Sequence, residues 1–161
     1  RLRERRPQPG EETLASYPDF ELAHLWKGQA HEELGELDEA ESSIELVVRL
    51  SGGSDISRAA LAHLRATQGR EVEARTILAD LEVESASGYV PSYEIARAWV
   101  GLGELDIAAS WLERAFRERA HSMAFLAVDP QLRPLAGHAE YERLLRELEL
   151  EAPPVEGAQG L

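Results

Sequence analysis

The residue types best suited to chemistry gather in the stretch His31-Glu32-Glu33-Leu34-Gly35. In zinc proteases, a helix carries His-Glu followed by a second histidine four residues after the first, and the glutamate acts as general base. Position 35 is Gly35, so that second ligand is missing. His24 and His31 lie seven residues apart without a placed carboxylate, which makes a poor metal site. We therefore expect packing or surface roles for these histidines and no bound metal.

Three further features contain residue types that can perform chemistry, and each favours a structural role. Paired carboxylates can perform acid–base catalysis, but a run of acids such as that between Glu32 and Glu41 usually forms a solvated helix face. The stretch Ser51–Ser54 lacks the lysine of a phosphate-binding loop and is typical of a flexible turn. Trp26, Trp99 and Trp111 fall within expected helices, where packing is the ordinary role. We expect a protein that is not an enzyme and that has no catalytic residue and no cofactor.

The composition limits the classes of partner. The chain has 161 residues, is 43% hydrophobic and carries a net charge of −13, which suits one all-helical domain. The negative charge disfavours direct binding to nucleic acid or to anionic lipid. No apolar run approaches the length needed to span a membrane. With no cysteine present, disulfides are excluded, and we expect a cytoplasmic protein.

A short phrase recurs at a fixed interval. It reads GELDEAE from Gly35, GREVEAR from Gly69 and GELDIAA from Gly103, so successive glycines are spaced 34 positions apart. Apolar residues around each phrase keep helical spacing, and each glycine favours the end of a helix. The pattern predicts three helical hairpins, with helices over 21–34 and 37–49, 55–68 and 71–84, and 91–102 and 105–118. One hairpin cannot bury its apolar face alone, whereas stacked copies can.

This period and its residue pattern resemble the tetratricopeptide repeat family. The family's small residue of the first helix falls at Gly28, Ala62 and Ala96, and that of the second helix falls at Ala40, Ala74 and Ala108. The large apolar position falls at Ile44, Leu78 and Leu112. The family's closing proline is missing, because Gly52, Ala86 and Ala120 stand there. The resemblance implies an all-α fold of three antiparallel helix-pair repeats in a right-handed superhelix, followed by a C-terminal helical cap.

The same resemblance divides the chain. Pro18 holds the closing-proline position one period before the first copy, which implies the remnant of a preceding repeat. The expected segments are a flexible linker at 1–13, the remnant at 14–20, repeats at 21–54, 55–88 and 89–120, a cap at 121–150 and a disordered tail at 151–161.

The cap segment is similar to the end of tetratricopeptide regions in bacterial multidomain regulators, including winged-helix regulators, cyclases and serine/threonine kinases. We expect a final helix near 138–148 with a buried stripe of Tyr141, Leu144, Leu145 and Leu148. The residues expected to cover the open apolar end of the stack are Phe125, Leu126, Leu132 and Leu135.

In this family the first helix of each repeat lines a concave groove. The groove-facing residues that the resemblance implies are Leu22, Leu25, Gln29 and Glu33, then Ala59, His63 and Thr67, and finally Tyr93, Arg97 and Val100. Tyr93 would offer an amphipathic contact, and Arg97 would hold a carboxylate of a partner. For any single residue the solvated inside of a spacer is an equal alternative, whereas for the face as a whole binding is favoured.

The expected function is a non-catalytic protein–protein interaction module. Its groove would face a partner protein or peptide, or another domain of the same full-length chain. The alternative is the effector-sensing or dimerising arm of a bacterial transcription regulator or signalling kinase. A homodimer is a further hypothesis, because Lys27 and His31 leave one end of the stack imperfectly covered.

Overall fold

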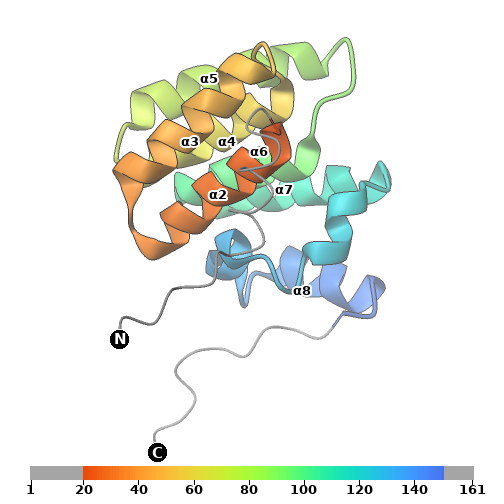
Figure 1. The fold of residues 1–161 in the computed structure, drawn as a ribbon. Coiled ribbons are helices and arrows are strands. Elements are labelled where there is room, and N and C mark those ends of the chain that lie inside the picture. The colour runs from red at the N-terminus through yellow and green to blue at the C-terminus, as the bar shows by residue number, and fades with distance from the viewer. Residues whose placement is uncertain (1–19, 151–161) are drawn as a thin grey trace, which may run out of the picture.

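The computed structural model describes residues 20–150, which form seven α-helices and two 3-10 helices and contain no strand (Figure 1). The elements are α2 (Glu21–Leu34), α3 (Leu37–Leu50), α4 (Asp55–Thr67), α5 (Glu71–Ser85), α6 (Ser92–Gly101), α7 (Leu105–Arg117), η1 (His121–Phe125), η2 (Pro130–Leu135) and α8 (Ala139–Glu147). The all-α prediction is confirmed, and the expected helix ends agree to within one or two residues. The predicted linker, the tail and all of the predicted remnant except Phe20 lie outside the described residues.

The helices pack as three successive hairpins, α2 with α3, α4 with α5 and α6 with α7. The middle hairpin joins the other two, because α4 contacts α2 and α3 on one side and α6 on the other. The first helices α2, α4 and α6 thus follow one another through the stack. Their arrangement brings positions 34 residues apart onto neighbouring helices.

Each hairpin turns at a glycine that holds the same position in its copy of the repeat. Gly35, Gly69 and Gly103 have φ angles of 74°, 75° and 75°, in the left-handed region that side chains with a Cβ atom rarely adopt. At the first turn the Gly35 amide donates to the Glu32 carbonyl at 2.9 Å, and the Glu36 amide donates to the His31 carbonyl at 2.9 Å. This closing pattern satisfies carbonyls that a helix end otherwise leaves unpaired.

The repeated small and large residues form the interior of the hairpins. Ala40, Ala74 and Ala108 are fully buried, and so are the large residues Ile44, Leu78 and Leu112. At Gly28 a Cβ atom would lie only 2.6 Å from Cγ1 of Ile44. The close approach of α2 to α3 therefore requires glycine at this position, as the small-residue pattern indicated.

The segment after α7, coloured cyan to blue in Figure 1, turns back against the third hairpin. Here η2 packs on α6 and α7, and α8 packs on α7. Leu126, Leu132 and Leu135 are fully buried, as expected of a cap, and the Tyr141 hydroxyl donates to the Leu126 carbonyl at 2.8 Å. The expectation for Phe125 is wrong, because its side chain is 61% exposed.

No helix between residues 20 and 150 combines the length and apolar character needed to cross a membrane. Within the same range, no group of three or more His, Cys, Asp or Glu side chains is arranged to hold a metal ion.

Candidate functional site: a pocket between the hairpins and the cap

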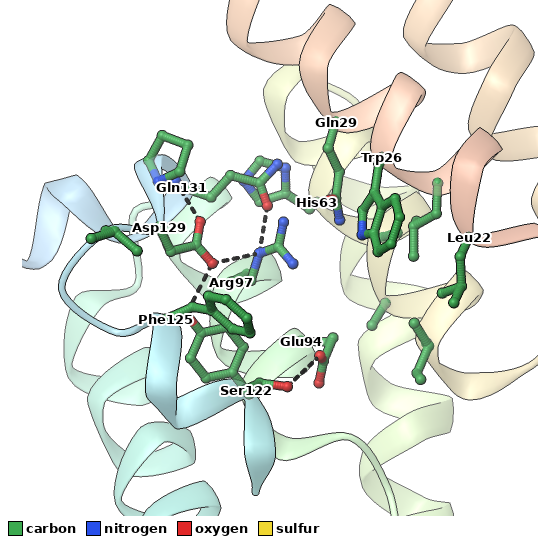
Figure 2. A pocket seen from close by; sticks show the side chains of 17 residues that line it. Leu22, Trp26, Gln29, His63, Glu94, Arg97, Ser122, Phe125, Asp129 and Gln131 are labelled. Carbon is green, nitrogen blue, oxygen red and sulfur yellow. Dashed lines mark hydrogen bonds and ion pairs between the residues drawn. The ribbon is translucent and has the colours of Figure 1, made fainter. Parts of the chain in front are cut away.

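A pocket of about 410 Å³ lies between the first helices of the hairpins and the cap segment (Figure 2). Helices α2, α4 and α6 supply one part of its lining, and residues between Ser122 and Gln131 supply the rest. The pocket is therefore built from residues as far apart in sequence as Leu22 and Gln131. Its shape depends on how the cap folds back on the hairpins.

Large exposed apolar side chains gather around this pocket. Trp26 is 60% exposed and Phe125 is 61% exposed, and Figure 2 shows them on walls formed by α2 and by η1. The other exposed apolar residues of the lining are Leu22, Ile56 and Val128. The expectation that Trp26 packs inside is wrong, whereas Trp99 is buried as expected. Exposed apolar side chains that cluster around a concave site are typical of binding sites, whereas single exposed apolar residues are normal on any surface.

The polar side of the pocket centres on Arg97. Its Nε lies 3.4 Å from Oδ2 of Asp129 and donates to Oε1 of Gln131 at 2.6 Å. The Gln29 amide oxygen, in the orientation that satisfies both groups, accepts from Arg97 Nη2 at 2.9 Å. The Tyr93 hydroxyl donates to Asp129 at 3.0 Å. Arg97 thus already pairs with a carboxylate of the same chain, and its expected contact with a carboxylate of a partner stays a prediction.

A second polar contact links the first two hairpins to the cap. Oε1 of Glu32 lies 2.8 Å from Nδ1 of His63, and Nε2 of Gln131 donates to Oε2 of Glu32 at 3.4 Å. Both Glu32 and His63 are buried. Glu32 is therefore not part of a solvated acidic face, which corrects the interpretation of the acidic run at this residue. The neighbouring Glu33, Glu36 and Glu39 are exposed as expected.

Glu94 is the other carboxylate of the lining. It is largely enclosed, and its Oε1 accepts from the Ser122 hydroxyl at 3.0 Å. Burial raises the pKa of the Glu94 carboxyl above its ordinary value of 4.5, because a charged group loses hydration there. None of the ion pairs found within residues 20–150 involves this side chain.

The structure brings most of the predicted groove residues together. Those that line the pocket are Leu22, Leu25, Gln29, Ala59, His63, Tyr93 and Arg97. Glu33 lines a smaller hollow beside it, together with Gln29 and Arg97. Thr67 is exposed and lies outside both linings, with its hydroxyl donating to the His63 carbonyl, and Val100 is buried elsewhere. Whether these residues bind a partner stays a prediction.

Lining residues absent from the predicted groove lie on the first helices, among them Trp26, Ile56 and Glu94, and in the cap segment. Trp26 stands four residues after Leu22 and three before Gln29, so helical spacing alone places it on the same face. That signal was present and was overridden by the general preference of tryptophan for cores. Phe125, Val128, Asp129 and Gln131 had no such signal, because their position depends on the path of the chain after α7.

Comparison of the chain with protein-family models, with curated proteins and with solved structures found no match. The tetratricopeptide resemblance therefore rests on the spacing and the residues of the three copies, and it stays a prediction.

Proposed function

We propose that this chain is a three-repeat tetratricopeptide module whose pocket binds an apolar segment of a partner protein or of another domain of the same full-length chain. One observation carries the proposal. Five large apolar side chains that are exposed to solvent, from α2, α4 and the cap segment, surround a single pocket. Exposed apolar residues scattered singly need no explanation, but a group around a concave site does.

The energetic argument follows from desolvation. Fully burying one leucine or phenylalanine side chain of a partner stabilises a complex by about 1.5–3 kcal/mol. The rim would gain further from the burial of Trp26 and Phe125, since aromatic residues dominate binding energy at protein interfaces. The polar contacts around Arg97 hold the pocket in one shape, which reduces the entropy lost on binding. Such a site suits a short segment with one or two apolar anchors.

The test begins with a selection of random octapeptides on the full chain by phage display. The binding of the enriched peptides is then measured by fluorescence anisotropy. We expect Trp26→Ala and Phe125→Ala each to weaken binding about tenfold, which corresponds to about 1.4 kcal/mol.

Leu34→Ala is the matched control, because Leu34 is an exposed apolar residue of α2 outside the pocket. It should leave the affinity unchanged. If the pocket variants bind every enriched peptide as tightly as the control does, the proposed site is wrong.

The regulatory-arm alternative differs in the occupant of the site, which would then be an effector or a neighbouring domain. Homodimerisation also stays a prediction. The dimer contact is expected at the end of the stack formed by the first hairpin. The surface there is polar and surrounds a hollow lined by Lys27, His31, Asp38 and Glu39. A mass that does not change with concentration would count against a dimer.

A further inference from the structure

The charges that line the pocket are unequally matched. Arg97 is bound by Asp129, Gln131 and Gln29, as described above. His63 is paired with Glu32 behind the lining. Glu94 is left with a hydroxyl donor from Ser122 and no ion pair within the described residues. The lining therefore holds two carboxylates, Glu94 and Asp129, against one guanidinium.

Building on the proposed function, we propose that the segment bound in this pocket carries a lysine or arginine next to its apolar anchor, and that the Glu94 carboxylate receives this cation. The inference specifies the chemistry of the partner. It reverses the sequence expectation, in which Arg97 would attract a carboxylate.

The position of Glu94 supports this assignment. In Figure 2 its carboxylate lies between the wall that carries Leu22 and Trp26 and the wall that carries Phe125. An apolar side chain seated between these walls would bring the next residue of the same segment towards Glu94. The aliphatic stem of a lysine or arginine would pack along the rings while its charged end reached the carboxylate.

Electrostatics favour a cation and oppose an anion at this site. A partly buried carboxylate has lost hydration, and a charge-assisted hydrogen bond from a cation compensates for that loss. An acidic segment would meet Glu94 and Asp129 with no free guanidinium to balance it. The net charge of −13 adds long-range attraction for a basic partner, and this attraction is not specific to the pocket.

A cation bound to Glu94 would also couple affinity to pH. Burial raises the pKa of this carboxyl, so part of the free protein is protonated in mildly acidic solution, and a bound cation favours the ionised form. Affinity should therefore rise with pH. Ionisable groups near Glu94 are Tyr89, Tyr93 and Arg97 on and before α6, Asp129 in the cap, and His63 on α4. Glu94→Gln removes this titration, so the rise in affinity with pH should be lost in that variant.

The experiment uses the octapeptides selected on the full chain. We expect the enriched sequences that depend on Trp26 and Phe125 to pair an apolar residue with lysine or arginine. In a second form of the strongest binder, its lysine or arginine is replaced by glutamine. The affinities of the two peptides are compared for the wild type, for Glu94→Gln and for Glu71→Gln. Both variants remove one negative charge. Glu71 is an exposed residue of α5 outside the pocket, so Glu71→Gln controls for the change in net charge alone.

The wild type and Glu71→Gln should prefer the basic peptide at least fivefold, and Glu94→Gln should lose this preference. The inference is overturned if the enriched peptides lack basic residues, if Glu94→Gln keeps the preference, or if Glu71→Gln loses it equally. In those cases the dependence on Trp26 and Phe125 still supports the pocket. If no peptide depends on those aromatic residues, the proposed function fails as well.

Discussion

The Arg97 guanidinium of α6 and the Asp129 carboxylate of the cap form an ion pair in the lining of the pocket. Their atoms lie 3.4 Å apart, and the side chains are only 14% and 10% exposed. The Tyr93 hydroxyl donates to the same carboxylate. The pair therefore joins the third hairpin to the cap on the polar side of the pocket.

Asp129→Ala is expected to destabilise the protein by about 2 kcal/mol, because hydrogen bonds to a charged group contribute about 1.5–3 kcal/mol. Urea unfolding followed by circular dichroism gives the free energy. Asp80→Ala, at an exposed position of α5, is the control and should change stability by less than about 0.5 kcal/mol. Equal effects of the two substitutions would mean that the ion pair does not hold the cap.

Glu94→Gln is expected to stabilise the protein at neutral pH. Burial raises the pKa of Glu94 in the folded state, so ionisation costs stability as pH rises from the ordinary value of 4.5 through the folded pKa. The advantage of Glu94→Gln should therefore be small near pH 4 and grow towards pH 7. Urea unfolding of the two proteins at several pH values measures the difference in their free energies of unfolding. A difference that does not change with pH would contradict the raised pKa of this carboxyl.

Gly69→Ala is expected to cost about 1–2 kcal/mol, because a residue with a Cβ atom is strained in the left-handed conformation of this turn. Gly88→Ala provides a matched control, since its φ is not in that region and no atom lies within 4 Å of the added Cβ. Thermal unfolding of both variants checks the prediction. A melting temperature of Gly69→Ala equal to that of the control would show that the turn relaxes.

Gly28→Ala is expected to lower stability although alanine favours helices. The added Cβ would lie 2.6 Å from Cγ1 of Ile44, and overpacking costs about 1–3 kcal/mol, against a propensity gain of about 1 kcal/mol. Ile44→Ala removes the clashing atom. In that background Gly28→Ala should no longer destabilise, and unfolding of the four proteins in this cycle tests it. Additive effects would rule out the clash.

The helices and hairpins were predictable because their signals are local. Apolar spacing marked each helix, and the recurring glycine marked each turn, where backbone conformation depends on the residue itself. The buried positions of Ala40, Ile44 and their repeats followed from the same period. Much of the groove face was also predictable, since Leu25, Ala59 and Tyr93 occupy equivalent places on successive first helices.

The chemistry of the pocket was decided by tertiary contacts. The sequence suggested that Arg97 would hold a carboxylate, but it did not show that the turn carrying Asp129 folds back and supplies one from the same chain. Phe125 is a large apolar residue of the kind that usually lies in a core, yet at the end of η1 its side chain is exposed at the pocket rim. These outcomes depend on contacts between segments far apart in the chain, such as Glu32 with Gln131, and helical periodicity contains no information about them. The sequence by itself determined which residues form helices and hairpins, because those signals are local. Only the tertiary structure decided which charges in the pocket form ion pairs, because those pairs join segments far apart in the chain.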